Sequence, residues 1–344
     1  MPHLALKKYS IPWSKNGQNP FWSFPREGLL AFVSLGGETY CGEYAPLQGI
    51  HSHTVNDVVG MARSIDIAPD FLQSDQKYNF PYPLSYLLSM VHAHYSLLAS
   101  SHDQDIKQAI LLSALVDEAE PGMAIKQAQG FLSQGYGCLK IKVGRDIVSE
   151  ADKINAIATF LPKDTLLRLD ANKKLSLGDA CRLMKSLRGL PIQYFEEPAQ
   201  NFSDALKLHE EYGVPIAIDE SFSAPFSMHN LLSSAAHYFI IKPSRFSSIY
   251  DAIALAKTAQ DHGITPIFST AFESDFTAAI MALLVVRAGL HEHAHGIFIE
   301  GMFNQSPWSI ALPALGGRIG YAEALSFIKA IGKGMNGHDE VFAL

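Results

Sequence analysis

Cysteine is scarce in this sequence of 344 residues: Cys41, Cys138 and Cys181 are the only three, and they share no motif. An odd number cannot pair completely into internal disulfides, which favours a reducing compartment. No hydrophobic run is long enough to span a membrane, and residues 1–13 lack the continuous apolar stretch of a signal peptide. We therefore expect a cytoplasmic protein that does not enter a membrane.

Basic residues form no block, and the formal net charge is −7 at pH 7. Nucleic acids and anionic membranes select concentrated Lys and Arg, so neither is an expected partner. A glycine-rich nucleotide loop after the first predicted strand is also lacking, which argues against an open doubly wound sheet. The composition, 48% hydrophobic and 18% charged, is typical of a globular protein with a sizeable core.

One pattern repeats from about residue 106 onward: a short apolar run, a polar turn and an amphipathic stretch. The apolar runs do not alternate with polar residues, as expected for parallel strands buried on both faces. Eight such strands alternating with helices predict an α/β fold, a closed (β/α)8 barrel of the TIM type with its functional groups at the carboxyl ends of the strands. The eight runs are Ile106–Leu115, Tyr136–Val143, Leu166–Asp170, Ile192–Phe195, Ile216–Ile218, Tyr238–Ile241, Thr265–Phe268 and Gly296–Ile299.

Residues 1–105 follow a different pattern. Residues 28–45 predict two strands around a Gly36-Gly37 turn, and residues 52–66 and 83–100 predict helices. We expect an α+β capping domain over residues 1–105 and a barrel catalytic domain over 106–310. The tail, residues 311–344, has no place in the barrel and is expected to return to the capping domain. The oligomeric state is not indicated.

Charged residues stand at the carboxyl ends of five successive predicted strands. A single charge at such a place is usually a solvated turn residue, but one per repeat is hard to explain in that way. The intervals between them each match one strand and one helix, so all the side chains can project into one barrel mouth. They are Lys140 and Lys142, two residues apart and therefore on one strand face, followed by Asp170, Glu196, Asp219 and Lys242.

Three carboxylates that converge in one mouth repel each other unless a cation lies between them. Asp170, Glu196 and Asp219 provide only oxygen ligands, which favours Mg²⁺, with Mn²⁺ as a substitute, over zinc. A cation that binds a substrate carboxylate acidifies its α-proton. A nearby lysine, its pKa lowered by the metal and by a second ammonium, can then remove that proton. The expected partner is a small-molecule carboxylate.

Arg168 precedes Asp170 by two residues, so it faces the same side one layer deeper. We expect it to support the acidic cluster or to bind a substrate carboxylate. Glu197 and Glu220 are expected on the other side of their strands, in supporting ion pairs. A last group matches no compact zinc motif and is expected to be an exposed loop at a helix end: His291, Glu292, His293 and His295.

These strand ends together resemble the muconate-lactonizing subgroup of the enolase superfamily. The resemblance implies a barrel with a capping domain built from both ends of the chain. It implies that Lys142 is the general base and acid, that Lys140 is a supporting charge, and that Lys242 faces the opposite side of an enediolate. It also implies Mg²⁺ on the three acids. The matching motifs are Lys140-x-Lys142, Asp170-x-Asn172, Glu196-Glu197-Pro198, Asp219-Glu220-Ser221 and Lys242-Pro243.

Within the subgroup, the sequence is most similar to members that dehydrate 2-succinyl-6-hydroxy-2,4-cyclohexadiene-1-carboxylate to 2-succinylbenzoate in menaquinone biosynthesis. The resemblance implies a syn elimination driven by aromatisation, with Ser269 and Thr270 on the substrate side. The stretches that carry it are Leu167–Asn172, Ile241–Ser244, Phe268–Ser274 and Gly42–Leu47.

Other activities of the superfamily remain alternatives. N-succinylamino-acid racemisation uses the same lysine pair, alone or as a second activity, and muconate cycloisomerisation is a third possibility. The seventh predicted strand has no His for a His–Asp dyad, and Phe298–Gly301 lacks the Asp-x-Asp of dipeptide epimerases. A non-catalytic, Mg²⁺-binding barrel would be expected to lose a catalytic residue, and none is lost.

Overall fold

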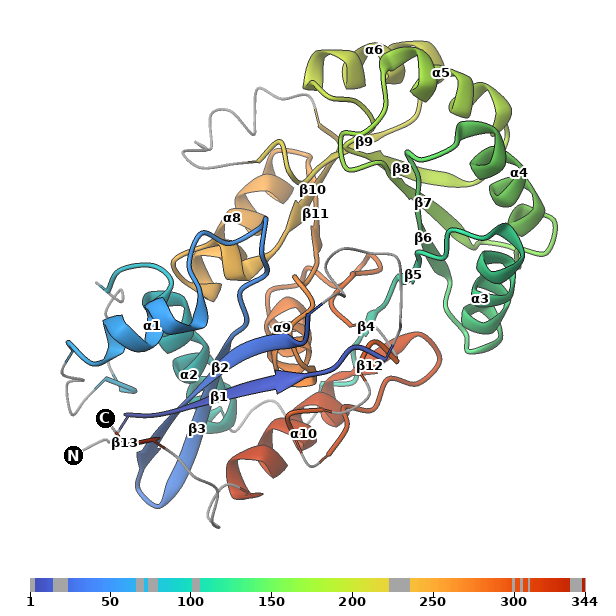
Figure 1. Ribbon diagram of the computed structural model, residues 1–344. Helices are drawn as coiled ribbons and strands as arrows, with labels where there is room; N and C mark the ends of the chain where they lie inside the picture. The colour runs from blue at the N-terminus through green and yellow to red at the C-terminus, as the bar shows by residue number, and fades with distance from the viewer. Residues whose placement is uncertain are drawn as a thin grey trace.

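The structure is a computed structural model, and it describes residues 4–14, 24–65, 71–73, 80–100, 106–222, 236–298, 301–303, 306–308, 310–334 and 342–343. A small antiparallel sheet with two helices lies beside a curved parallel sheet that carries helices along its outer side (Figure 1). This is the α/β barrel with an α+β cap that the sequence predicts. Among the described residues, no helix is long and apolar enough to cross a membrane.

The antiparallel sheet of the cap has four strands in the order β13-β1-β2-β3. Gly36 and Gly37, at φ 63° and 87°, make the tight turn between β2 and β3, as the sequence predicts. The first cap helix begins with a capping box in which the Thr54 hydroxyl and the Asp57 carboxylate each accept from the other's backbone N–H. The elements are β1 Leu4–Ile11, β2 Arg26–Leu35, β3 Glu38–Tyr44, α1 Val55–Ala62, α2 Leu84–Ala99 and β13 Phe342–Ala343.

The barrel sheet has seven parallel strands in the unbroken order β11-β10-β9-β8-β7-β6-β5. Figure 1 shows α3 to α6 along the outer side of β5 to β9. The strands are β5 Ala114–Val116, β6 Cys138–Lys142, β7 Leu166–Asp170, β8 Ile192–Glu196, β9 Ile216–Ile218, β10 Tyr238–Ile241 and β11 Thr265–Phe268. The helices are α3 Pro121–Ser133, α4 Ile147–Ala158, α5 Leu177–Ser186, α6 Phe202–Tyr212, the 3₁₀ turn η3 Pro243–Arg245, α8 Ile249–Asp261 and α9 Asp275–Arg287.

The first and eighth predicted strands differ from the observed ones. The run Ile106–Leu115 is divided into β4, Ala109–Leu111, and β5, because β4 pairs antiparallel with β12, Arg318–Gly320. The eighth strand is reduced to single bridges, in which His295 pairs with Leu112 and Gly296 pairs with Ser269. These bridges connect the first barrel strand to the seventh. The end of the predicted run, Ile299, lies outside the described residues.

The carboxyl-terminal helix α10, Tyr321–Gly334, packs on α9 of the barrel and on β3 of the cap. The terminal strand β13 pairs with β1, so the tail contacts both parts of the chain. The division at residues 105 and 106 stays a prediction, because residues 101–105 lie outside the described part of the chain. Residues 15–23 of the predicted capping domain lie outside it as well.

Candidate active site

Three of the predicted residues lie in one row across neighbouring strands. Lys142 on β6 is in register with Asp170 on β7, which is in register with Glu196 on β8. Parallel pairing at this register turns the three side chains to the same side of the sheet. Asp170 and Glu196 are 1% and 0% exposed. The row therefore puts a lysine and two buried acids side by side at the carboxyl ends of the strands.

Asp219 and Lys242 stand one residue beyond the ends of β9 and β10. The Lys242 ammonium donates to Asp219 Oδ2. The Arg245 guanidinium donates to Asp219 Oδ1 at 3.1 Å. Arg245 is a neighbour that the sequence did not reveal, because it follows Lys242 in a 3₁₀ turn rather than at strand spacing.

The two lysines of β6 reach the acids of the next strands. Lys140 Nζ lies 2.8 Å from Asp170 Oδ2 and donates to Glu196 Oε1 at 2.8 Å. Lys142 Nζ donates to Asp170 Oδ2 at 2.6 Å and to Asn172 Oδ1 at 2.7 Å. The Asn172 amide in turn donates to Glu220 Oε1 at 2.7 Å. Asn172 and Glu220 thus fix the position of the Lys142 ammonium.

Glu197 supports the site from behind. Its φ of 43°, in the left-handed region, turns the chain directly after Glu196. Its carboxylate then accepts the backbone N–H groups of Asp219 and Ser221, at 2.7 and 2.6 Å, and the Ser221 hydroxyl at 2.7 Å. Glu197 therefore holds the segment that carries Asp219, in agreement with the supporting role expected for it.

The charges in the mouth shift each other's protonation. Burial, and then repulsion by Asp170 and Asp219, raises the pKa of Glu196 to about 8. Burial also acts to raise the pKa of Asp170, but Lys140 and Lys142 lower it below its usual value. Burial acts to lower the pKa of Lys242, yet Asp219 raises it above the ordinary value. The sequence analysis expected a metal and a second ammonium to lower the pKa of a catalytic lysine. With Asp219 as its neighbour, Lys242 instead has a raised pKa.

The ligand chemistry of the three acids suits a cation of the magnesium type, but their present arrangement does not form a metal site. The three acids offer only oxygen atoms and are almost fully buried. Glu196 Oε2 accepts no hydrogen bond of good geometry, although Lys140 Nζ lies 2.8 Å from it. Within the described part of the chain, no three acidic, His or Cys side chains are arranged closely enough to hold a metal ion. Ammonium groups contact these oxygens instead, so a cation would have to replace some of those contacts.

Three further residues of the predicted site, Arg168, Ser269 and Thr270, lie on or directly after barrel strands. Arg168 is 1% exposed, and its Nε donates to Gln193 Oε1 at 2.7 Å while its guanidinium lies over the Tyr194 ring. Arg168 is in register with Lys140, one layer below Asp170, and no ion pair among the described residues joins it to an acid. Ser269 and Thr270 directly follow β11, where the Ser269 hydroxyl lies 3.3 Å from the Gly296 carbonyl oxygen.

The expectation of an exposed loop at residues 291–295 is wrong for His295. That side chain is 0% exposed; its Nδ1 accepts from Phe268 N and its Nε2 lies 3.0 Å from the Leu290 carbonyl oxygen. Burial, followed by the Arg168 guanidinium, lowers its pKa to about 3. His295 is thus a neutral residue of the barrel closure, with one ring nitrogen accepting and the other donating.

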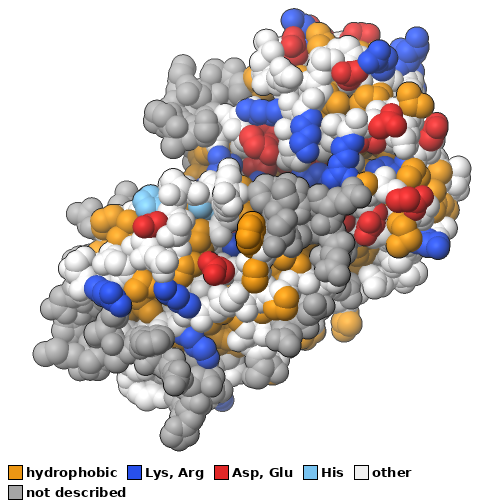
Figure 2. Space-filling view, in the orientation of Figure 1, with side chains coloured by type: hydrophobic (Ala, Val, Ile, Leu, Met, Phe, Trp, Pro, Cys, Tyr) orange, Lys and Arg blue, Asp and Glu red, His pale blue; other side chains and the backbone are white. Residues whose placement is uncertain are grey.

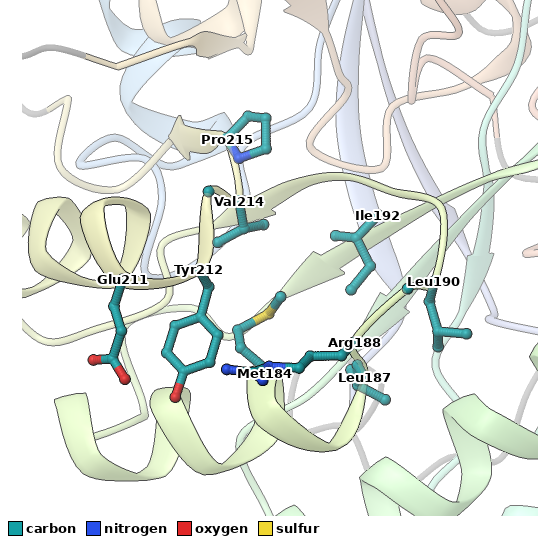
Figure 3. Close-up of a pocket in the computed structure, with 11 residues that line it drawn as sticks. Met184, Leu187, Arg188, Leu190, Ile192, Glu211, Tyr212, Val214 and Pro215 are labelled. Atoms are coloured by element: carbon teal, nitrogen blue, oxygen red, sulfur yellow. The ribbon is translucent and has the colours of Figure 1, made fainter.

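A cavity of about 420 Å³ lies at the opposite end of the strands (Figure 3). It is bordered by Met184 and Leu187 of the α5 region, by Tyr212 of α6, and by Ile192 and Pro215 near the starts of β8 and β9. Functional groups of such barrels sit at the carboxyl ends, so this cavity is not part of the site.

On the face shown in Figure 2, acidic and basic side chains are interspersed over the barrel.

Comparisons with known proteins give one consistent family. The chain matches the family "Enolase C-terminal domain-like" over residues 123–311. It is 32% identical to an o-succinylbenzoate synthase of Pasteurella multocida, with 82% of this chain and 84% of that protein covered. It is 25% identical to an N-succinyl-L-Arg/Lys racemase of Bacillus cereus over 49% of this chain and 46% of that protein. It is 26% identical to protein PHYLLO of Arabidopsis thaliana over 74% of this chain, which spans only 17% of that longer protein.

Solved structures share the fold. The chain superposes on the L-Ala-D/L-Glu epimerase of Bacillus subtilis with a TM-score of 0.76 and 18% identity, covering 93% of this chain and 96% of that one. It superposes on MenC of Desulfotalea psychrophila with a TM-score of 0.72 and 19% identity, covering 93% and 99%. With the family match over more than half of its length and the strand-end residues in place, this chain belongs to the enolase superfamily.

Proposed function

We propose that the chain is an o-succinylbenzoate synthase, a hydro-lyase that converts 2-succinyl-6-hydroxy-2,4-cyclohexadiene-1-carboxylate to 2-succinylbenzoate. The observation that carries the proposal is the row Lys142, Asp170 and Glu196, with Asp219 and Lys242 on the next two strand ends. This arrangement puts two lysines around a buried acidic cluster. The similarity to the Pasteurella multocida synthase supports the choice of substrate.

In this proposal, Asp170, Glu196 and Asp219 hold Mg²⁺, for which Mn²⁺ can substitute. When bound, the ion stabilises the negative charge that grows on the substrate carboxylate as the α-proton leaves. Lys140, between Asp170 and Glu196, adds a positive charge next to the same two acids.

Lys142 takes the α-proton and returns it to the departing hydroxyl group on the same face of the ring. The C–H and C–O bonds break, water leaves, and the ring becomes aromatic, so atoms and electrons balance without another reactant. The Asn172 amide oxygen, at 2.7 Å, orients the Lys142 ammonium. Lys242 stays protonated and stabilises the negative charge from the other side.

Racemisation of N-succinylamino acids is the second candidate. It needs one proton acceptor and one proton donor on opposite faces of the α-carbon. Lys142 pairs with Asp170 and Lys242 pairs with Asp219, so the two ammonium groups approach the acids from different strands. The similarity to the Bacillus cereus racemase supports this activity as an additional one.

Parallel assays with the purified, Mg²⁺-loaded chain distinguish the two activities. We expect loss of the cyclohexadiene substrate and formation of 2-succinylbenzoate, followed by ultraviolet absorbance and confirmed by mass spectrometry. The racemase arm follows the optical rotation of N-succinylamino acids. Racemisation without any dehydration would replace the synthase proposal by the racemase; neither reaction would refute both.

The proposal extends to the place of the enzyme. We infer a cytoplasmic role in menaquinone biosynthesis, for which the three free cysteines are consistent support. We also propose a cap made of residues 1–105 and 311–344 around a catalytic barrel of residues 106–310, which the β13–β1 pairing supports.

A further inference from the structure

We propose that Arg26 and Glu43, two buried charged residues of the cap sheet, are positioning residues that hold the barrel loop between β11 and α9, residues 269–274. This loop follows β11 and carries Ser269 and Thr270. The catalytic consequence rests on the proposed function, whereas the structural clamp itself does not. Together with His51, a residue of the loop after β3, they are termed the cap clamp.

Arg26 on β2 is 2% exposed and directs its guanidinium into both parts of the chain. Toward the barrel, Nε donates to the Phe272 carbonyl at 2.9 Å and Nη2 donates to the Ala271 carbonyl at 3.0 Å. Toward the cap, Nη1 donates to the Pro46 carbonyl at 2.5 Å, and Nη2 also donates to the Ala45 carbonyl. One planar cation therefore joins the cap loop to the barrel loop through carbonyls that a smaller donor cannot reach together.

Glu43 on β3 is 0% exposed and binds the start of the helix that follows the loop. It accepts the Ser274 N–H at 3.1 Å, the Ser274 hydroxyl at 2.8 Å and the Thr277 hydroxyl at 2.6 Å. Tyr9 of the cap donates to it as well. Ser274 is the N-cap of α9, where a carboxylate also meets the positive end of the helix dipole. Glu43 thus helps to cap the amino terminus of the barrel helix α9, although it lies 231 residues away from Ser274 in the sequence.

His51 adds a third link. Its Nδ1 accepts the Leu47 N–H at 2.9 Å, so its proton is on Nε2, which lies 3.1 Å from the Ser244 hydroxyl. Ser244 then donates to Glu273 Oε1 at 2.7 Å. Ser244 lies two residues after Lys242, and Glu273 belongs to the held loop. The cap therefore contacts the segment that follows the sixth-strand lysine and the loop that follows the seventh strand.

These contacts explain how the loop can keep an unfavourable backbone conformation at Phe272. Phe272 has a φ of 63°, a conformation that a side chain other than glycine adopts only when its surroundings impose it. Arg26 binds the carbonyls of Phe272 and of the residue before it. If the clamp is weakened, the loop is expected to sample other conformations and the substrate side of the site to lose its fixed shape.

The test uses the full chain loaded with Mg²⁺ and four variants. Arg26→Met removes the guanidinium N–H donors, and Arg26→Lys keeps the positive charge but loses the planar guanidinium. Thr277→Val removes the hydroxyl that donates to Glu43 and keeps a side chain of similar shape. Arg63→Met, which removes an exposed arginine of the same cap, is the matched control. The first readout is hydrogen–deuterium exchange of residues 270–277, with the barrel strands at residues 138–142 and 166–170 as internal references. The second readout is KM and kcat for dehydration.

We expect Arg26→Met to accelerate exchange in residues 270–277 by about tenfold or more and to raise KM by a similar factor. The free energy of a hydrogen bond to a charged group corresponds to a change of about tenfold or more in an equilibrium constant. The kcat value and the reference strands should change little. Arg26→Lys and Thr277→Val should have smaller effects in the same direction, and Arg63→Met none.

Unchanged exchange in the loop of folded Arg26→Met overturns the clamp. An equal acceleration in loop and reference strands also overturns it, because the residue is then merely structural. If Arg26→Met does not fold, Arg26→Lys and Thr277→Val decide: loop exchange equal to that of Arg63→Met refutes the clamp. If the wild-type chain dehydrates nothing, the proposed function fails, whereas the exchange data still decide whether the clamp exists.

Discussion

The barrel mouth and the cap–barrel boundary both bury charges, but they satisfy them differently. In the mouth, acids and lysines bond to one another: Lys140 reaches Asp170 and Glu196, and Lys242 reaches Asp219. At the boundary, Arg26 bonds to backbone carbonyls and Glu43 accepts from hydroxyls and an N–H.

The buried acids of the mouth therefore have partners that can be exchanged, whereas Arg26 at the boundary has partners that are fixed in place. Lysines on long stems can release a carboxylate when a cation and a substrate arrive, and the Lys142 side chain is still 33% exposed. Backbone carbonyls cannot move away from Arg26 without refolding a loop. Substitutions in the mouth should therefore remove activity with little change in stability, whereas buried groups with backbone partners should affect stability or loop order before chemistry.

The largest effect is expected for Lys142. Lys142→Ala should lower the dehydration rate by roughly a thousandfold or more, within the about 10²–10⁴-fold range for loss of a general base. Lys142→Arg should fail too, because a guanidinium keeps its proton near neutral pH. The dehydration rate is measured with the Mg²⁺-loaded variants, and the urea midpoint should stay near that of the wild type. Residual dehydration well above a thousandth of the wild-type rate would remove Lys142 from its role.

The acidic residues sharpen the comparison. Glu196→Gln should lower dehydration by about a hundredfold or more, because a metal contributes several kcal/mol to the transition state. The metal-free variant should be as stable as the wild type or more so, since burial and neighbouring acids disfavour the Glu196 carboxylate and raise its pKa to about 8. Activity and urea unfolding are measured on the same preparations. A variant that is active, or that is inactive because it is unfolded, contradicts this. Asp170→Asn and Asp219→Asn should likewise lose most activity while remaining folded.

Lys242→Arg is expected to have a graded effect. It keeps the positive charge but moves it, so a trace of dehydration should remain, about 10²–10³-fold below the wild type, as for loss of one group that stabilises developing charge. Racemisation of an N-succinylamino acid requires Lys242 to move a proton, so it should disappear. Proton NMR in D₂O and polarimetry measure the two reactions. Equal losses of both activities would show that Lys242 has one role in both.

His295, a buried residue with backbone partners, tests the expectation that such groups act on stability. Since the pKa of His295 falls to about 3 from an ordinary 6.5, the unfolded state binds more protons below pH 6.5. Stability should thus be fully present above pH 6.5 and fall toward pH 3, by up to about 1.4 kcal/mol per pH unit for this group. His295→Gln should show a shallower decline in urea unfolding, and the exposed His262→Gln should keep the wild-type slope. Equal slopes for wild type and His295→Gln would contradict the assignment.

Much of the barrel was predictable from the sequence. The predicted strands at 166–170, 216–218, 238–241 and 265–268 match β7, β9, β10 and β11, because apolar runs between polar turns mark doubly buried strands. The first strand was not predictable as two pieces, since β4 pairs with β12 more than 200 residues later. Nor did periodicity reveal that the eighth strand is reduced to His295 and Gly296.

The same physical limit applies to the site. Residues one repeat apart were predicted to meet, because the carboxyl ends of parallel strands share one mouth, and Lys142, Asp170 and Glu196 lie in register. Arg26, Glu43 and Ser244 carried no such signal. Their partners belong to another part of the chain, so only the packing of cap on barrel shows their contacts.

The central claim is that a divalent cation held by Asp170, Glu196 and Asp219 enables removal of the α-proton. The most direct measurement is the rate at which one preparation dehydrates 2-succinyl-6-hydroxy-2,4-cyclohexadiene-1-carboxylate as purified, after treatment with EDTA, and after Mg²⁺ or Mn²⁺ is restored. We expect activity to vanish with the metal and to return with either ion, because the three acids then regain the cation that stabilises the developing negative charge. Full activity in metal-free buffer would contradict the account.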